Sequence, residues 1–312
     1  MLVLAGENDR QLARLKDVPH TTASEISTFG EAAGSASVIL NWSGSRELLR
    51  AVFALCPHVT WVHSRSAGLD KLLFPELVES DVILTNGRGV FSASLGEFAL
   101  AAILYFAKDF RRMIRNQSAG VWKPFDVEVI EEKTVGIVGY GDIGQAVAAR
   151  VHAMGMRLLA TKRHPPQDKD PLIERFYRPQ ELREMLQHCD YIVATAPLTE
   201  ETRHMIDAAE FAAMKPTAVV INVGRGPVIS ETALVQALTS GRIKGAGLDV
   251  FEQEPLPAGH PLYHLENVLL SPHCADNTPD WKDRAMAFFL KQYDRFTRNE
   301  PLENVVNKRL GY

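Results

Sequence analysis

The chain has 312 residues, which is long for one hydrophobic core and predicts two domains. Hydrophobic residues make up 46% of it and charged residues 23%, as is typical of a globular protein, and no apolar run approaches transmembrane length. The net charge of −4 gives no reason to expect nucleic acid or an anionic membrane as a partner. Any basic cluster therefore needs a local explanation.

The three cysteines, Cys56, Cys189 and Cys274, are scattered and form no C-x-x-C motif. This pattern argues against a disulfide framework and a zinc site, and it fits a reducing compartment. The N-terminal apolar run is too short for a signal peptide. We therefore expect a cytoplasmic protein with no metal site.

Short apolar runs alternate with helical stretches over residues 1–90. Strands are predicted at Leu2–Ala5, Val38–Trp42, Val59–Val62 and Val82–Thr85, and Arg46–Leu55 predicts one of the helices between them. Such alternation is typical of a parallel sheet with helices on both faces, and the loops at the carboxyl ends of its strands are where such sheets bind ligands. This region predicts a small α/β domain with its own binding edge.

One long helix is predicted from Ser94 to Arg115, with a broad apolar face. The arginines at its end, Arg111, Arg112 and Arg115, suit the negative end of the helix dipole and solvent. We expect this helix to connect the first domain to the second.

The central motif of the chain follows an apolar strand at Val135–Val138. Gly139, Gly141 and Gly144 form the pattern G-x-G-x-x-G, a helical stretch follows, and a second short strand ends near Ala160. In this setting the first glycine allows a tight turn, the second lets a pyrophosphate approach the backbone, and the third lets helix and strand pack closely. The motif predicts a dinucleotide site with the diphosphate at the helix N-terminus.

The end of the second strand indicates which dinucleotide binds. NAD sites usually place an acidic residue there for the ribose 2′-hydroxyl, but this chain has Thr161, Lys162, Arg163 and His164. Guanidinium and ammonium groups bind phosphate oxygens with charge-assisted hydrogen bonds. We therefore predict NADP(H) as the cofactor, with NAD as the weaker alternative; a solvated basic loop is the other interpretation.

The rest of the chain completes a doubly wound parallel sheet, with strands predicted at Tyr191–Thr195, Ala218–Val223, Ala246–Val250 and Val268–Ser271 and helices around Glu181–Gln187 and Thr232–Thr239. Asp280 to Thr297 predicts a last amphipathic helix, which an irregular tail follows. Because an α/β unit precedes the glycine motif, we expect an inserted dinucleotide domain at 95–281. Residues 1–94 and 282–312 would then form the substrate domain.

Three of the predicted strand ends carry charged residues that packing alone explains poorly, namely Arg225, Glu254 and His273. Each should emerge at the carboxyl edge of the sheet, where the dinucleotide binds. A carbonyl that accepts a hydride must also receive a proton, which suits a histidine, and an adjacent glutamate would fix its tautomer. A substrate carboxylate needs a fork-shaped cation, which suits an arginine. Alone, each of these residues also fits a turn or a helix cap.

These residues belong to longer motifs, and the set resembles the D-isomer-specific 2-hydroxyacid dehydrogenases in order and spacing from about Ser66 to the C-terminus. The motifs are Gly139-Tyr140-Gly141-Asp142-Ile143-Gly144, Ala196-Pro197-Leu198-Thr199, Asn222-Val223-Gly224-Arg225-Gly226, Leu248-Asp249-Val250-Phe251 through Glu254-Pro255, and Ser271-Pro272-His273. The basic Lys162-Arg163 and the Arg-Leu-Gly-Tyr ending look most like the glyoxylate/hydroxypyruvate reductase branch.

The resemblance implies two Rossmann-like doubly wound domains, the substrate domain being flavodoxin-like, with a cleft between them and usually a homodimer. It implies NADP(H)-dependent reduction of a 2-oxo acid to the D-2-hydroxy acid. Arg225 would bind the substrate carboxylate and carbonyl, His273 would act as general acid/base with Glu254 as its partner, and backbone groups at Ala67, Gly68 and Gly89 would add substrate contacts. The implied cofactor contacts are Gly139, Tyr140, Gly141, Asp142, Ile143, Gly144, Thr161, Lys162, Arg163, Ala196, Pro197, Thr202, Val223, Gly224 and Asp249, the last holding the nicotinamide carboxamide.

Two other functions remain open at this point. One is a dinucleotide-sensing regulatory protein without catalysis, and the other is an NAD-linked dehydrogenase such as a 3-phosphoglycerate or formate dehydrogenase. The complete set of Arg225, Glu254 and His273 argues against the first, and the basic strand end argues against the second. The sequence Cys274-Ala275-Asp276 and the nearby Trp281 depart from the family pattern, which leaves the substrate open.

Overall fold

The computed structural model of the chain describes residues 1–6, 9–166 and 168–312. The chain folds into two compact units: unit 1 comprises residues 1–91 and 278–312, and unit 2 comprises residues 92–277. Unit 2 is therefore inserted between the two segments of unit 1. The boundaries expected from the sequence lay after 94 and 281.

Unit 1 is built on a five-stranded parallel sheet in the order β2-β1-β3-β4-β5, which is the flavodoxin-like order. Its strands are β1 (Leu2–Leu4), β2 (Thr21–Ala23), β3 (Val38–Asn41), β4 (Trp61–Ser64) and β5 (Ile83–Thr85). Side chains alternate between the two faces of a strand. Ile39 accordingly packs with α1 (Gly30–Ser35), α2 (Arg46–Phe53) and α3 (Pro75–Glu79), while Val38 and Leu40 pack with α10 (Trp281–Thr297).

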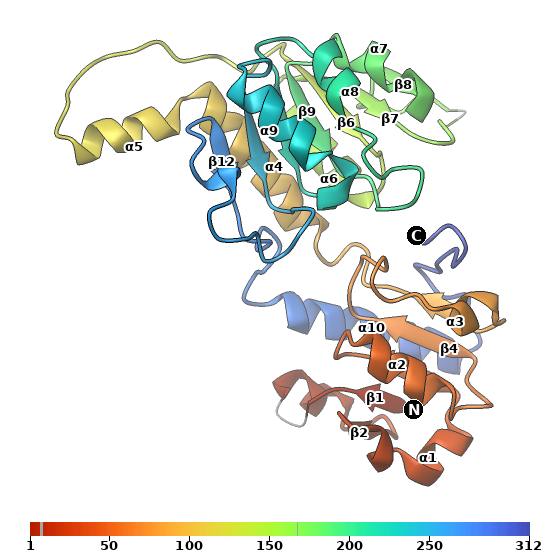
Figure 1. Cartoon of the computed structure of the whole chain (residues 1–312). Helices are drawn as coiled ribbons and strands as arrows, with labels where there is room; N and C mark the ends of the chain where they lie inside the picture. The colour runs from red at the N-terminus through yellow and green to blue at the C-terminus, as the bar shows by residue number, and fades with distance from the viewer. Residues whose placement is uncertain (7–8, 167) are drawn as a thin grey trace. The chain divides into compact units, whose positions relative to one another are not determined.

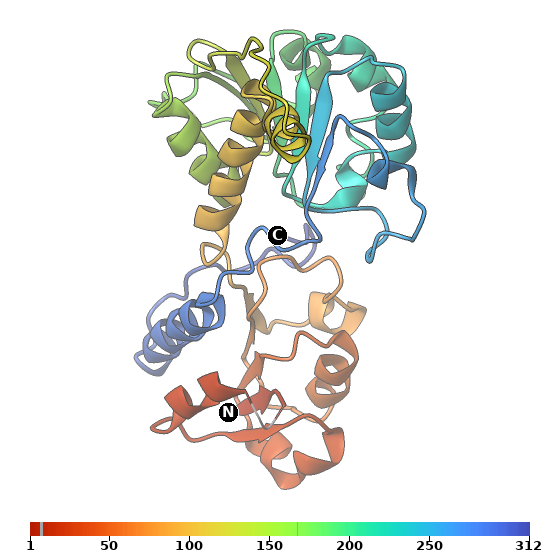
Figure 2. The ribbon, with the colours of Figure 1, turned by 90° about the vertical axis from the view of Figure 1, so that its left-hand side faces the viewer.

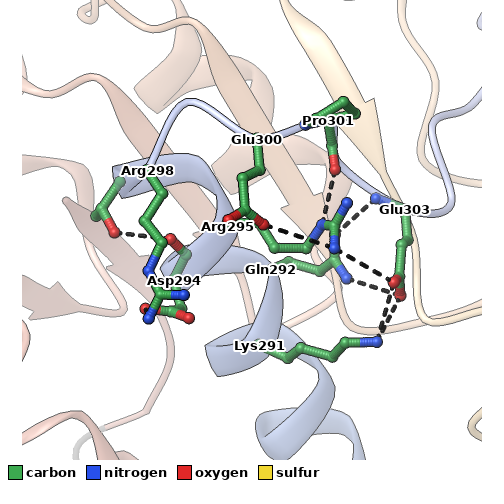
Figure 3. Close-up of polar contacts among 9 residues, drawn as sticks. Lys291, Gln292, Asp294, Arg295, Arg298, Glu300, Pro301 and Glu303 are labelled. Atoms are coloured by element: carbon green, nitrogen blue, oxygen red, sulfur yellow. Dashed lines mark hydrogen bonds and ion pairs between the residues drawn. The ribbon is translucent and has the colours of Figure 1, made fainter.

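The C-terminal tail is fixed to unit 1 by polar contacts with α10, which Figure 3 shows. The buried Gln292 donates to the Glu303 carboxylate at 3.1 Å and accepts the Glu303 backbone N–H at 2.7 Å. Arg295 donates to the carbonyl of Pro301 at 2.7 Å. Beyond this clamp, Val305 forms an antiparallel bridge with Thr85, so the tail continues the sheet at β5.

Unit 2 is built on a seven-stranded parallel sheet in the order β12-β11-β10-β9-β6-β7-β8. Its strands are β6 (Thr134–Val138), β7 (Arg157–Thr161), β8 (Arg175–Tyr177), β9 (Tyr191–Ala194), β10 (Val219–Asn222), β11 (Gly245–Leu248) and β12 (Val268–Leu270). The strand order reverses between β6 and β9, and this switch point is where doubly wound sheets bind dinucleotides.

Helices cover both faces of this sheet (Figures 1 and 2). On one face α4 (Ser92–Ala107) packs against α6 (Asp142–His152), and on the other α7 (Leu182–Leu186), α8 (Ala208–Ala213) and α9 (Glu231–Thr239) pack in one apolar cluster. Gly245 and Gly247 on β11 make room for α4, because a Cβ at Gly245 would lie 2.5 Å from the Phe106 ring. Both predicted parallel sheets with helices on both faces are confirmed.

The single helix predicted from Ser94 to Arg115 is wrong, because two helices occupy this region. α4 ends at Ala107, and α5 (Phe110–Ser118) begins after Asp109. Asp109 has a left-handed backbone with φ of 50°, and its side chain accepts the N–H of Arg112 as an N-cap. This conformation cannot continue a helix, so the chain turns here.

Two short strands and three short helices were not predicted from the sequence. β2 and β8 have three residues each and lie at sheet edges, where little apolar side chain is buried. α1, α3 and α8 have six, five and six residues, too few for a helical period to emerge. In the described ranges, no helix is both long and apolar enough to cross a membrane.

The buried His63 makes the stability of unit 1 dependent on pH. Its side chain lies between Thr85, whose hydroxyl is 2.7 Å from Nδ1, and the ring of Phe289. Burial lowers the pKa of this histidine from 6.5 to about 3. Between these values the unfolded chain binds a proton that the folded chain excludes, so stability falls as the pH drops below 6.5.

We expect acidification to cost up to about 1.4 kcal/mol of unfolding free energy per pH unit through His63. The change is measured by urea unfolding at about pH 7 and about pH 5, followed by tryptophan fluorescence, since Trp42, Trp61 and Trp281 all lie in unit 1. His63→Gln, which stays neutral, should show a smaller dependence on pH. Equal dependence in both proteins would contradict this assignment.

Candidate active site

The glycine turn between β6 and α6 has the geometry that its sequence predicts. Gly139 has φ of +99°, a conformation that side chains other than glycine rarely adopt, and a Cβ there would lie 2.7 Å from the backbone of Ala196. A Cβ at Gly144 would lie 2.7 Å from the Gly139 carbonyl oxygen. These two glycines therefore let α6 and the end of β9 pack directly against the turn.

The N-terminus of α6 offers room and charge for a phosphate group. Its N-cap residue is Gly141, which has no side chain to bond the first amides of the helix, and a Cβ added there would meet no atom within 4 Å. Unpaired amides and the helix dipole attract anions at this position. The Ser92 hydroxyl donates to the Asp142 carboxylate at the start of the helix. The N-terminus of α6 therefore fits a dinucleotide diphosphate.

The predicted 2′-phosphate residues at the end of β7 differ in what their side chains do. Thr161 is buried, and its hydroxyl accepts the Gly139 N–H at 3.0 Å, so it braces the glycine turn. Lys162 lies over the Tyr140 ring at 5.7 Å, and Arg163 forms an ion pair with Glu201. Two cations thus flank the strand end, one of them already oriented by an acid.

Tyr140, the variable residue inside the glycine motif, closes one side of this strand end. Its hydroxyl donates to the Asp170 carboxylate at 3.1 Å, and its ring meets Phe176 edge-on. Burial, with the Asp170 hydrogen bond, raises the pKa of Tyr140 to about 12. The phenol therefore stays protonated and keeps Asp170 as its acceptor.

The loops after β9 and β10 pack closely against each other. A Cβ at Gly224 would lie 2.9 Å from the Ala196 carbonyl oxygen, and Val223 is buried behind it. The Thr202 hydroxyl donates to the Pro197 carbonyl at 2.6 Å and so closes the loop after β9. Among the predicted cofactor contacts on these two loops, Ala196 and Gly224 border the switch point with backbone atoms rather than with side chains.

Arg225 follows β10 on a backbone that the Asn222 side chain holds. The Asn222 amide donates to the Arg225 carbonyl at 3.0 Å and accepts the Gly224 N–H at 3.1 Å. A Cβ at Gly226 would lie 1.9 Å from the carbonyl group of Phe251, so this loop contacts the loop after β11 directly. The glycine thereby places Arg225 beside the segment that carries Glu254.

His273 and Glu254 form the pair that the sequence predicts. Glu254 Oε2 lies 2.9 Å from His273 Nδ1, and Glu254 Oε1 accepts the Phe251 N–H at 3.1 Å. The backbone therefore fixes the carboxylate and the carboxylate fixes the ring, which leaves Nε2 as the nitrogen that faces other groups. The His273 side chain is 41% exposed, so a ligand can reach it.

Asp249 has a structural role that the sequence analysis missed. Its buried Oδ1 accepts three hydrogen bonds, from the Ser271 hydroxyl at 2.6 Å and from the N–H groups of Cys274 at 2.9 Å and Ala275 at 3.0 Å. His273 lies inside this loop with a left-handed φ of 51°. The Asp249 carboxylate therefore holds the loop in the conformation that presents the histidine.

Asp276 is a second carboxyl group near the pair, and the sequence analysis gave it no role. Burial raises the pKa of Asp276, and the charges of His273 and Arg225 offset this only in part. The only feature of the sequence that could have pointed to Asp276 was its position three residues after His273. Asp276 therefore interacts electrostatically with both His273 and Arg225.

In unit 1, the loops after β4 and β5 carry the predicted substrate contacts Ala67, Gly68 and Gly89. They are joined where the Asn86 side chain donates to the Ala67 carbonyl at 2.7 Å and where the Gly87 N–H donates to Ser66 at 3.1 Å. Gly89 has a left-handed φ of 92°. These loops form the carboxyl edge of the smaller sheet.

His260, which lies in the loop before β12, has structural partners. His260 forms an ion pair with Glu231 at 3.1 Å and accepts the Leu262 N–H at 3.3 Å. Across the residues placed by the structure, no group of three or more His, Cys, Asp and Glu side chains is arranged to hold a metal ion.

The chain was compared with known protein families and with curated proteins. The sequence model described as "D-isomer specific 2-hydroxyacid dehydrogenase, NAD binding domain" matches residues 100–275. The glyoxylate/hydroxypyruvate reductase B of Citrobacter koseri is 36% identical over 303 residues, which cover 94% of this chain and 91% of that protein.

Solved structures that are similar to this chain include members of the same family. A D-isomer specific 2-hydroxyacid dehydrogenase of Xanthobacter autotrophicus, in complex with NADPH and MES, has a TM-score of 0.84 and 30% identity, covering 100% of this chain and 99% of that one. An NADPH-dependent glyoxylate/hydroxypyruvate reductase of Sinorhizobium meliloti, in complex with NADP and sulfate, has a TM-score of 0.83 and 26% identity, covering 97% and 95%.

Proposed function

The chain belongs to the D-isomer specific 2-hydroxyacid dehydrogenase family, and we propose that it is an NADP(H)-dependent enzyme that reduces a 2-oxo acid of the glyoxylate/hydroxypyruvate type, or a related one, to the D-2-hydroxy acid. The observation that carries this proposal is the hydrogen-bonded His273–Glu254 pair at the same sheet edge as Arg225 and the glycine turn. Unit 2 binds the dinucleotide, and unit 1 contributes substrate contacts at Ala67, Gly68 and Gly89.

Each charged residue has one task in this reaction. The bound dinucleotide would supply the hydride to the carbonyl carbon. The Arg225 guanidinium binds the substrate carboxylate and polarises the carbonyl group. His273 donates a proton from Nε2 to the carbonyl oxygen, because its Nδ1 faces Glu254. Glu254 fixes the orientation of the ring through its contact with Nδ1.

Two findings support NADP(H) rather than NAD as the cofactor. Lys162 and Arg163 flank the strand end that meets the adenosine ribose in such sheets, and no acid stands among residues 161–164. The relatives from Xanthobacter autotrophicus and Sinorhizobium meliloti were solved with NADPH and NADP. In our proposal the 2′-phosphate takes the Arg163 guanidinium that Glu201 orients, and Asp249 reaches the nicotinamide carboxamide.

A homodimer is supported by the apolar arm of unit 2, which we define as residues 110–129. In Figure 1 the yellow α5 and the chain that follows it extend beyond the sheet of unit 2. Large apolar side chains are exposed along this arm, and Trp122 is 97% exposed; the others are Phe110, Met113, Ile114, Val121, Val127 and Val129. Exposed apolar patches of this kind mark interfaces, and we propose a second copy of the chain as the partner.

A cytoplasmic location is supported by the cysteines. Cys56, Cys189 and Cys274 are all free thiols, and the first two are buried in the cores of unit 1 and unit 2. Reducing compartments preserve such thiols. Fractionation of the source cells would test this assignment.

We expect His273→Ala to lower kcat by about 10²- to 10⁴-fold, because the general acid is lost, while the Kd for NADPH stays unchanged. Glu254→Gln should lower kcat by a smaller factor. The matched control is His260→Ala, which removes a histidine from another His–Glu pair of unit 2. Steady-state assays with glyoxylate, hydroxypyruvate and pyruvate measure the effect, and near-full activity of His273→Ala would remove this residue from the acid role.

We expect kcat/KM with NADPH to exceed that with NADH by at least about tenfold. Arg163→Ala should raise KM for NADPH by about ten- to a hundredfold and leave KM for NADH nearly unchanged, because a charge-assisted phosphate bond is lost. Arg157→Ala, at the opposite end of β7, is the control, since its guanidinium pairs with Glu174. Equal kcat/KM values for the two cofactors in the unmodified protein would contradict the NADP(H) assignment.

We expect sedimentation velocity to give the mass of a dimer, and Ile114→Asp with Trp122→Ser to shift it to the monomer. These changes place polar groups in the proposed interface. Tyr263→Ser removes an exposed aromatic ring elsewhere on unit 2 and should leave the dimer intact. A dimer that resists the double substitution would show that the arm is not the interface.

The sensor function remains the alternative from another class. It predicts tight NADPH binding without turnover of any 2-oxo acid. The same assays decide between the two, because a panel of 2-oxo acids with NADPH either shows oxidation of the cofactor or does not.

A further inference from the structure

Arg65 lies at the carboxyl edge of the unit 1 sheet and has no role in the reaction described above. It follows β4 directly and precedes the loop at Ala67 and Gly68. β3, the neighbouring strand, ends next to Trp42. Arg65 is therefore the first residue after its strand, at the edge where parallel sheets bind ligands.

Two tryptophans hold the Arg65 guanidinium. Its carbon Cζ lies 5.6 Å from the ring centre of Trp42 and 5.4 Å from that of Trp281. Trp42 is fully buried, and its indole N–H donates to Asp9 at 2.8 Å, so this ring is fixed. The guanidinium has lost much of its side-chain freedom before any ligand binds, which lowers the entropy cost of binding one.

No acidic side chain among the described residues is in direct contact with the Arg65 guanidinium. In the segments that the structure describes, its one polar contact is to the Ser43 carbonyl at 3.4 Å, and no carboxylate oxygen lies within 4.0 Å of it. Burial lowers the pKa of the guanidinium, and the more distant Asp9 offsets this partly. Asp9 itself is engaged by Trp42 and by Lys282, whose Nζ is 3.6 Å away.

A second arginine lies on the adjoining loop. Arg88 donates from Nε to the Asn304 side chain at 3.1 Å, and Asn304 also donates to the Arg88 carbonyl at 2.8 Å. Its contacts among the described residues include no carboxylate. The two loops therefore bring two arginines to this edge, and among the described residues neither contacts a carboxylate, unlike Arg50, which pairs with Glu76.

We propose that Arg65, held between Trp42 and Trp281, binds a second anionic group on the substrate. A partly desolvated cation without an acidic partner gains most from a ligand anion, because the anion replaces the solvation that burial removed. The substrate class is then a 2-oxo acid whose side chain ends in a carboxylate or a phosphate. This inference rests on the proposed function and names the substrates that the enzyme prefers.

Matched substrate pairs test this specificity at saturating NADPH. 2-Oxoglutarate is compared with 2-oxoglutaramate, its neutral amide, and phosphohydroxypyruvate with hydroxypyruvate, so that carboxylate and phosphate are distinguished. We expect kcat/KM for the charged member of one pair to be at least about tenfold higher. Arg65→Gln should abolish this ratio mainly through KM, Arg65→Lys should keep part of it, and Arg14→Gln, an exposed arginine of the same unit, should not change it.

A ratio near one in the unmodified protein overturns the proposal. It is also overturned if Arg65→Gln lowers kcat/KM equally for both members of each pair, since Arg65 would then only support the fold. If the protein turns over no 2-oxo acid, the proposed function fails, and titration of the NADPH-bound protein with 2-oxoglutarate decides on the anion site. The anion site is supported if 2-oxoglutarate quenches the tryptophan fluorescence of the unmodified protein but not that of Arg65→Gln. It is overturned if both proteins show equal quenching or if neither shows any.

Discussion

The active site of unit 2 depends on close contacts between strand-end loops that only glycine permits. A Cβ at Gly139 or Gly144 would overlap the backbone of a neighbouring segment, and one at Gly226 would lie 1.9 Å from the Phe251 carbonyl group. The first two contacts join β6, α6 and β9 at the switch point. The third joins the Arg225 loop to the segment that carries Glu254. The same packing constraint thus positions both the glycine turn proposed to bind the cofactor and the segments that carry the His273–Glu254 pair.

A chain of hydrogen bonds converts this packing into a defined orientation of His273. Asp249 holds the loop around the histidine through the N–H groups of Cys274 and Ala275, while Glu254 holds the ring through Nδ1. Two carboxylates therefore fix one imidazole, one through the backbone and the other through the side chain. Such double support keeps a reactive group in place despite a strained backbone.

Unit 1 uses the same principle at its own edge. The Asn86 side chain joins the loops after β4 and β5, and Asn304 in the C-terminal tail bonds to the second of these loops. The tail itself is fixed by Gln292 and Glu303 (Figure 3). The last residues of the chain thus brace loops that lie more than two hundred positions earlier in the sequence.

Local sequence patterns were sufficient to predict both parallel sheets, the inserted second unit, the glycine turn and the identity of the charged strand-end residues. These follow from local patterns: apolar runs of strand length, helical periods, and glycines at fixed spacing. The break at Asp109 and the three-residue edge strands β2 and β8 did not follow, because a left-handed backbone and a short edge pairing leave no periodic signal.

The partners of the polar side chains, in contrast, became known only from the folded structure. Thr161 bonds to the glycine turn, Asp249 accepts three donors from the His273 loop, and Arg65 lies between two tryptophans that are distant in sequence. The physical reason is that hydrogen bonds, burial and ring contacts depend on distances between segments that the fold brings together. A local pattern names a residue type, whereas its partner and its charge environment are set by residues far along the chain.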